Sequence, residues 1–281
     1  MPFTEIRGRK IYYEMHGDGD TVLLLHHGFA SAKMWKEIYP SIVAAGYRVV
    51  VYDRRGYGQS DPGPDFEEFW VSDTFVDENV KDLAELIKAL NLDPFSIVGQ
   101  CEGGVVGMEY AGRFPLHVKA LAVASTLCFS QTTLIEFNKL KFPKSFQELE
   151  PDIRDKMIRW HGSDHAEPLY EMARTRGGAY GSGFFDFRPR LPFVTCPTLI
   201  LYPDRSALFE VEQAVAFYRL LQNAELAVIP RCGHNTYDQK PEEYIGHVLN
   251  FLNRTSHETG KEEVDYSMTC IAPAPPRSES G

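Results

Sequence analysis

Short apolar runs alternate along this chain with longer segments in which apolar residues recur every three or four positions. The runs predict strands that are covered on both faces, and the periodic segments predict amphipathic helices that pack against them. The segment Thr74–Leu90 shows the helical spacing clearly, with Val76, Val80, Leu83 and Ile87 on one face. The pattern therefore predicts a layered protein of buried strands and surface helices.

The expected elements follow one another in a regular order. We expect strands at Phe3–Arg7, Lys10–Glu14, Val22–His26, Tyr47–Tyr52, Phe95–Val98, Val118–Ala124, Thr198–Tyr202 and Glu225–Ile229. We expect helices at Ser31–Ala44, Thr74–Leu90, Gly103–Phe114, Val211–Leu221 and Pro241–Asn253. Strands that alternate with helices in this way predict an α/β fold with a mostly parallel central sheet and helices on both faces.

The alternation stops between residues 127 and 192, where no strand pattern is found and short amphipathic stretches mix with aromatic residues. We interpret this segment as a helical cap inserted into a core formed by residues 1–126 and 193–254. Residues 255–281 are polar and end in "APAPPRSESG", a composition that rarely packs into a core. We expect them to form a flexible tail.

Charge and composition exclude some classes of binding partner. The chain has 281 residues and a formal net charge of −10, which argues against nucleic acid and anionic membranes as partners. No apolar run approaches the roughly 18 residues of a membrane helix, and the N-terminus has no apolar signal core. The five cysteines fit neither a disulfide framework nor a zinc site. We expect a cytoplasmic protein, monomeric or homodimeric, with a small-molecule substrate.

A glycine-rich stretch, "VGQCEGG", carries the strongest chemical signal. Gly99-Gln100-Cys101-Glu102-Gly103 matches the pattern G-x-nucleophile-x-G between a strand and a helix. A serine usually stands at the tip of such a turn, and here Cys101 takes its place. The helix N-terminus is expected to lower the pKa of this thiol, and Glu102 opposes that effect unless its carboxylate points away. The alternative is a buried, inert cysteine.

The chain resembles the α/β-hydrolase family over residues 11–252. The resemblance rests on the turn around Cys101, which this family calls the nucleophile elbow, and on three further stretches: "LLLHHGFASAKMW", "YDRRGYGQSD" and "IPRCGHNTYDQKPEEYIGHVLNFL". It implies that His234 is the catalytic base and that the backbone N–H groups of Phe29 and Glu102 form an oxyanion hole. It also implies that His27 holds the oxyanion loop. A cysteine at the elbow is similar to that of dienelactone hydrolases.

The orienting acid departs from this family's pattern. The turn after the strand Thr198–Tyr202 reads "YPDRSALFE", so Ser206 stands where the family usually has its acid. We take Asp204 as the candidate third member of a catalytic triad. Glu210, a Ser206 that only hydrogen-bonds the imidazole, or no third member at all remain alternatives. A thiol tolerates weak support of the base better than a hydroxyl, because its intrinsic pKa is about 8.5.

Residues of the cap give weaker signals. His161, Asp164 and His165 are spaced as metal ligands can be, but without a third separated ligand we interpret them as solvated residues. No metal is expected, and no cofactor, since neither a dinucleotide fingerprint nor a P-loop is present. Cap aromatics predict an apolar or aromatic substrate, although several can simply pack the cap. They are Phe129, Phe137, Phe142, Trp160, Tyr170, Tyr180, Phe184, Phe185 and Phe187.

Three functions fit these observations. The leading hypothesis is an enzyme that hydrolyses a small or medium carboxylic ester, thioester or lactone through a covalent acyl-enzyme on Cys101. The second is an acyltransferase, cyclase or C–C lyase that uses Cys101 and His234 differently. The third is a non-catalytic, ligand-binding member of the fold, which only the missing acid supports.

Overall fold

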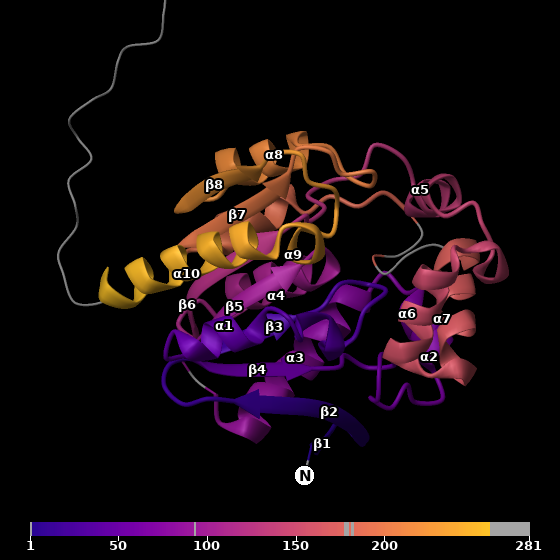
Figure 1. Ribbon diagram of the computed structural model, residues 1–281, viewed down its shortest axis with the longest axis horizontal. Coiled ribbons are helices and arrows are strands. Elements are labelled where there is room, and N and C mark those ends of the chain that lie inside the picture. Colours follow the sequence, from indigo (N-terminus) through magenta and orange to yellow (C-terminus); the bar gives the residue numbers. More distant parts are fainter. Residues whose placement is uncertain (1, 93, 177–179, 181–182, 259–281) are drawn as a thin grey trace, which may run out of the picture.

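The computed structural model describes residues 2–92, 94–176, 180 and 183–258. Their eight strands form a single sheet in the order β1-β2-β4-β3-β5-β6-β7-β8 (Figure 1). The bounds are β1 Phe3–Ile6, β2 Arg9–His16, β3 Thr21–Leu25, β4 Arg48–Tyr52, β5 Phe95–Gln100, β6 Val118–Ala124, β7 Thr198–Pro203 and β8 Ala224–Ile229. The pairs β1–β2 and β2–β4 are antiparallel, and the other pairs are parallel. The predicted α/β fold with a mostly parallel sheet is confirmed.

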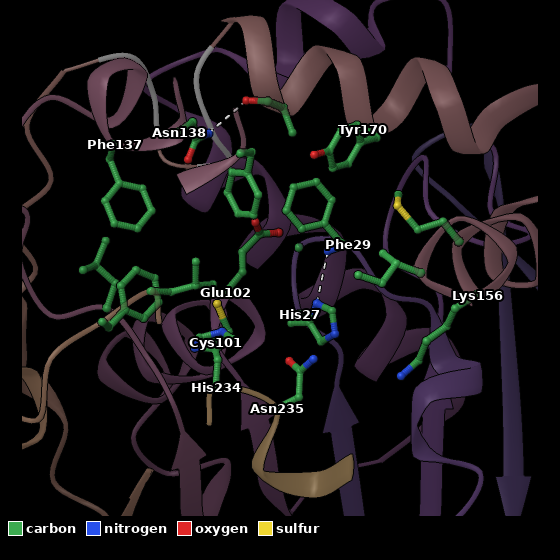
Figure 2. Close-up of a pocket in the computed structure, with 18 of the residues that line it drawn as sticks. His27, Phe29, Cys101, Glu102, Phe137, Asn138, Lys156, Tyr170, His234 and Asn235 are labelled. Carbon is green, nitrogen blue, oxygen red and sulfur yellow. Dashed lines mark hydrogen bonds between the residues drawn. The ribbon is translucent and has the colours of Figure 1, made fainter. Parts of the chain in front are cut away.

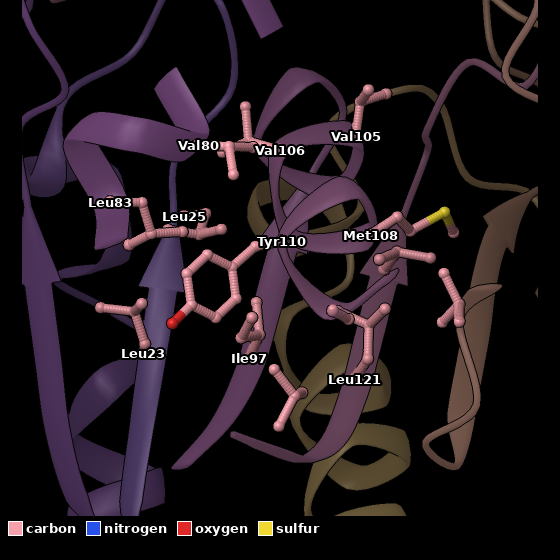
Figure 3. Close-up of a cluster of buried hydrophobic side chains, with 14 of the residues drawn as sticks. Leu23, Leu25, Val80, Leu83, Ile97, Val105, Val106, Met108, Tyr110 and Leu121 are labelled. Atoms are coloured by element: carbon pink, nitrogen blue, oxygen red, sulfur yellow. The ribbon is translucent and has the colours of Figure 1, made fainter. Parts of the chain in front are cut away.

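Helices cover both faces because alternate residues of the central strands point to opposite sides. Leu23 and Leu25 of β3 pack in one apolar layer with residues of α3 and α4, whereas Val22 and Leu24 pack in a second layer with residues of α1 and α10. Figure 3 shows the first of these layers. The helices are α1 Tyr39–Ala44, α3 Phe75–Leu90, α4 Glu102–Arg113, α8 Glu212–Leu220 and α10 Pro241–Glu258. Strands buried on both faces explain the uninterrupted apolar runs of the sequence.

Some boundaries differ from those expected. The helix expected at Ser31–Ala44 is divided into a 3-10 turn, Ala32–Trp35, and α1, which has a proline in its first turn. Proline lacks an N–H and favours the start of a helix, so the division falls just before it. The last helix continues through Thr255, which is buried, to Glu258. Residues 255–258, which were expected to belong to the tail, are thus helical. The rest of the expected tail, residues 259–281, lies outside the described part of the chain.

The segment between β6 and β7 contains α5 Leu134–Lys141, α6 Pro151–His161 and α7 Ser163–Arg176. Figure 1 shows these helices grouped at one end of the sheet, beside the short α2 (Phe66–Trp70). That is the end at which the parallel strands finish, and where ligands usually bind in open α/β sheets. Among the described residues, no helix is both long and apolar enough to cross a membrane.

The turn between β5 and α4 depends on glycine because α4 approaches β3 very closely. A Cβ atom on Gly103 would lie 2.3 Å from the carbonyl oxygen of Leu25 and 2.6 Å from that of His26. Both contacts are with backbone, which cannot swing aside. A side chain at this position would therefore push the helix, and the residue at the tip of the turn with it, away from the sheet.

We expect Gly103→Ala to lower the free energy of unfolding by about 1–3 kcal/mol, the usual cost of overpacking. Gly112→Ala in the same helix is the matched control. Its Cβ would meet its first neighbour at 3.5 Å, so the better helix propensity of alanine should raise stability by up to about 1 kcal/mol. Urea unfolding measures both. Equal effects of the two substitutions would contradict the close approach of α4 to β3.

Candidate active site

A cavity of about 480 Å³ lies between the carboxyl ends of the parallel strands and the helices of residues 127–192. Cys101 and His234 both line it, together with Phe29 and Glu102 (Figure 2). The structure thus brings together four of the five residues that the sequence predicted for the site.

Cys101 occupies the tip of the turn between β5 and α4. Its backbone has φ 52° and ψ −115°, a conformation that costs energy for any residue except glycine. Three backbone bonds hold it there: Cys101 N–H donates to the Ala124 carbonyl at 2.8 Å, and the Cys101 carbonyl accepts the N–H groups of Gly104 at 2.9 Å and Val105 at 3.3 Å. The side chain is half-buried at the N-terminus of α4. The strain therefore presents the sulfur to the cavity.

His234 follows β8, and residues at the ends of β5 and β6 hold its backbone. Its carbonyl accepts hydrogen bonds from Ser125 Oγ at 2.7 Å and from Gln100 Nε2 at 3.1 Å. The imidazole packs edge-on against the ring of Phe209, with the two ring centroids 5.3 Å apart. Burial lowers the pKa of His234 to about 4, because a charged imidazolium is poorly solvated there. The ring is therefore neutral near neutral pH.

Ser206, not Asp204, is the hydrogen-bond partner of His234. Ser206 Oγ and His234 Nδ1 share a bond of 3.2 Å. The Asp204 carboxylate instead accepts the Cys232 N–H at 3.0 Å, and hydrogen bonds from the backbone of Arg231 and Cys232 lower its pKa. Asp204 thus stabilises the turn between the ends of β7 and β8. The geometry corrects the assignment of Asp204 as the orienting acid.

The oxyanion loop is fixed on both sides. The Phe29 N–H donates to His27 Nδ1 at 3.2 Å, and His27 Nε2 pairs with the Tyr237 hydroxyl at 3.1 Å. The Phe29 carbonyl accepts a 3.1 Å bond from His161 Nε2, whose other nitrogen accepts the Gly58 N–H. An oxyanion at this position has to compete with His27 for the Phe29 N–H.

The two histidines at the α6–α7 junction were expected to be solvated, but both contact the protein instead. His161 is buried, and His165 Nε2 donates to the Gly56 carbonyl at 2.6 Å. Both rings tie α6 and α7 to the loops that follow β3 and β4.

Comparison with known proteins agrees with this geometry. Residues 21–177, more than half of the chain, match the model of the α/β hydrolase fold family. The chain belongs to this family. It is accordingly an enzyme of the α/β-hydrolase superfamily.

Individual relatives of this α/β hydrolase have several activities. The chain is similar to 2-hydroxy-6-oxo-6-(2'-aminophenyl)hexa-2,4-dienoic acid hydrolase of Metapseudomonas resinovorans, with 28% identity over 92% of each chain. It is 35% identical to a non-heme chloroperoxidase of Kitasatospora aureofaciens, over 90% of this chain and all of the other. Among solved structures, the enol-lactonase of Burkholderia xenovorans LB400 has the same fold, with a TM-score of 0.71, 16% identity and coverage of 90% and 100%.

Behind the elbow of this α/β hydrolase lies a buried ion pair that the sequence alone does not reveal. Arg54 Nη1 donates to Glu102 Oε1, which also accepts the Tyr57 hydroxyl at 3.2 Å. Arg54 Nη2 donates to the His26 carbonyl at 3.2 Å. Arg54 and Glu102 are almost completely buried. The family motif "YDRRGYGQSD" supplied Arg54, but only the fold shows that its partner is the residue after the nucleophile.

The electrostatics of Cys101 differ from those expected. Burial and the Glu102 carboxylate raise the pKa of the Cys101 thiol to about 12. Both effects outweigh those of the backbone N–H of Glu102, of Arg54 and of the Tyr180 hydroxyl, which lower it. The expectation of a low pKa at the helix N-terminus is therefore wrong, because burial destabilises the thiolate more than the helix N-terminus stabilises it. At rest the site contains a neutral thiol beside a neutral imidazole.

Tyr180 was expected in the pocket wall, but the sequence did not reveal its effect on Cys101. Its hydroxyl is buried and makes no geometrically regular hydrogen bond to the other described residues. The hydroxyl is near enough to Cys101 for its O–H to favour the thiolate form of that thiol. A tyrosine in an aromatic-rich segment carries no sign of such a role, because most aromatic residues there could equally pack the cap.

The remaining cavity wall is mostly apolar. Of the aromatic residues predicted to shape the pocket, five line the cavity: Phe137, Phe142, Trp160, Tyr170 and Tyr180. Phe129, Phe184, Phe185 and Phe187 do not line it. Lys156 is the only lysine or arginine among the described lining residues, and its Nζ is paired with Asp238 at 2.7 Å.

Removing Arg54 should expose the importance of the ion pair. We expect Arg54→Met to lower the free energy of unfolding by about 3–5 kcal/mol, because the Glu102 carboxylate remains buried without its counter-charge. The double variant Arg54→Met, Glu102→Gln should recover much of that loss, since no unpaired charge is left. Urea unfolding of the two single variants and the double variant checks this. Strictly additive losses would contradict a coupled pair.

Proposed function

We propose that this α/β hydrolase cleaves a neutral carboxylic ester, thioester or lactone of small or medium size through a covalent acyl-enzyme on Cys101. The observation that carries the proposal is that Cys101 stands at the strained tip of the elbow, with His234 in the wall of the same apolar cavity. A nucleophile there reaches a carbonyl carbon held in the cavity. In this proposal the Glu102 N–H, at the start of α4, acts as an oxyanion donor.

The proposed reaction has two steps. In the first, the Cys101 sulfur attacks the carbonyl carbon while its proton passes to His234 Nε2, and the tetrahedral intermediate collapses as His234 returns that proton to the leaving oxygen or sulfur. In the second, water or another acceptor attacks the thioester and gives a proton to His234; the C–S bond then breaks, the acyl product leaves, and the Cys101 sulfur takes the proton back from His234. Each oxyanion donor contributes roughly 3 kcal/mol to lowering the barrier. Phe29 supplies the second donor once the oxyanion displaces His27 from its N–H.

Two features support a neutral, apolar substrate. The wall is largely aliphatic and aromatic, which favours apolar groups. The cationic Lys156 is already paired with Asp238 and lies over the Trp160 ring, 5.1 Å from its centroid. An anionic substrate would therefore find no free positive charge among the described lining residues. We infer that residues 127–192 act as a cap that closes this wall.

A covalent intermediate is the direct test of this proposal. Intact-mass analysis after addition of p-nitrophenyl butyrate should show an adduct of one butyryl group, formed on Cys101. The adduct should be absent in Cys101→Ala, whose fold can be checked by its thermal melting. An adduct of equal yield in Cys101→Ala would overturn the assignment of the nucleophile.

The fate of the adduct identifies the acceptor. If the enzyme is a hydrolase, butyrate should form at the same rate with and without an added alkylamine or thiol. If the added acceptor makes the adduct disappear faster and a butyramide or a new thioester forms, the result would instead favour the acyltransferase hypothesis. No adduct under any condition would favour lyase chemistry or simple ligand binding.

A further inference from the structure

Ser206 makes three hydrogen bonds through one oxygen atom. Its Oγ accepts the Leu208 N–H at 3.2 Å and the Phe209 N–H at 3.1 Å, and it shares a third bond of 3.2 Å with His234 Nδ1. These contacts cap the turn that follows β7 and place the hydroxyl beside the ring. The direction of the third bond determines which nitrogen of His234 carries the proton.

That direction follows from the number of donors and acceptors that a serine hydroxyl has. A hydroxyl has two lone pairs and one proton, and a backbone N–H can only donate. The N–H groups of Leu208 and Phe209 use both lone pairs, which leaves the hydroxyl proton for His234. Nδ1 of a neutral imidazole that receives this proton acts as the acceptor, so the ring proton resides on Nε2.

We propose that Ser206 is a positioning residue that holds resting His234 in the Nε2–H tautomer, the reverse of the tautomer that a base for Cys101 requires. The inference rests on the proposed function, in which Nε2 receives the thiol proton. A carboxylate at this place can only accept, and would fix the proton on Nδ1 and leave Nε2 free. Ser206 does the opposite.

The consequence is a rate penalty, not a blocked reaction. Cys101 can transfer its proton only to the minor tautomer, in which Nδ1 holds the ring proton and Nε2 is bare. The transfer then yields a thiolate and an imidazolium, and the imidazolium later gives its Nε2 proton to the leaving group. In serine proteases, replacement of the triad aspartate by asparagine leaves the wrong tautomer and lowers kcat by about 10⁴. Here the chain itself contains a donor at this place.

Other groups near His234 do not change the direction of this hydrogen bond. The Asp204 carboxylate is engaged with the Cys232 N–H, and the edge-on packing of Phe209 against His234 keeps the ring in place. Among the described residues, Ser206 is the only one that hydrogen-bonds the His234 ring. The tautomer is thus decided by one hydroxyl.

Substitutions that differ only in donor character test the proposal. Ser206→Asp offers oxygens to Leu208 N–H, Phe209 N–H and His234 Nδ1, and should move the ring proton to Nδ1. Ser206→Asn has nearly the same size but can direct its amide N–H to Nδ1, and should keep the proton on Nε2. NMR of protein labelled with heavy nitrogen in histidine reports the tautomer of His234 directly, and thermal melting shows that each variant is folded.

The expected result is an Nε2–H tautomer in the wild type and in Ser206→Asn, and an Nδ1–H tautomer in Ser206→Asp. Alkylation of Cys101 by iodoacetamide near neutral pH, followed on its peptide by mass spectrometry, should be at least about tenfold faster in Ser206→Asp than in Ser206→Asn, a factor equivalent to about 1.4 kcal/mol. A wild-type His234 protonated on Nδ1 would overturn the proposal, as would equal alkylation of the Asp and Asn variants.

These readouts separate this inference from the proposed function. Neither NMR nor alkylation requires turnover of an ester. If all variants show the expected tautomers but none forms an acyl-enzyme, the proposed function fails and the role of Ser206 stands. If the wild type forms an acyl-enzyme but has the Nδ1–H tautomer, the proposed function stands and the role of Ser206 fails.

Discussion

The buried ion pair between Arg54 and Glu102 connects the parts of this candidate active site. Glu102 begins α4 immediately after Cys101, and Arg54 follows β4, so the pair joins the elbow to the neighbouring loop. Tyr57 and the His26 carbonyl complete the network, and a Cβ on Gly28 would lie only 2.7 Å from the Glu102 carboxylate. The oxyanion loop, the elbow and the turn after β4 are therefore packed around one compensated charge pair.

The same pair influences the chemistry. The Glu102 carboxylate lies close enough to Cys101 to disfavour its thiolate, and burial acts in the same direction. Burial also keeps His234 neutral. The site thus differs from cysteine enzymes that store a thiolate–imidazolium pair, and in the proposed mechanism its charge forms only when a substrate carbonyl is attacked. A resting thiol protected in this way is also less exposed to oxidation, since the thiolate is the form that reacts.

Much of this could be predicted from the sequence, because local patterns encode it. Apolar runs and helical spacing gave the sheet and its main helices, and the glycines around Cys101 located the elbow. The sequence offered both Asp204 and Ser206 as partners of His234 and could not choose between them, since residues two positions apart in one loop differ only in side-chain direction. The structure bears out the Ser206 alternative. It also could not pair Arg54 with Glu102, because that contact spans 48 positions in the chain and depends on the fold. The raised pKa of Cys101 depends first on burial, which also appears only in the fold.

The central claim is that the resting site contains a neutral thiol and a neutral imidazole. Ultraviolet thiolate absorbance of the wild type minus that of Cys101→Ala, recorded against pH, measures the ionisation of Cys101 alone. A free thiol would be largely ionised by about pH 9.5. The account predicts almost no thiolate from Cys101 up to about pH 9, where the wild type remains folded by near-ultraviolet circular dichroism. A difference signal that is already complete near neutral pH would show a stored ion pair and contradict the account.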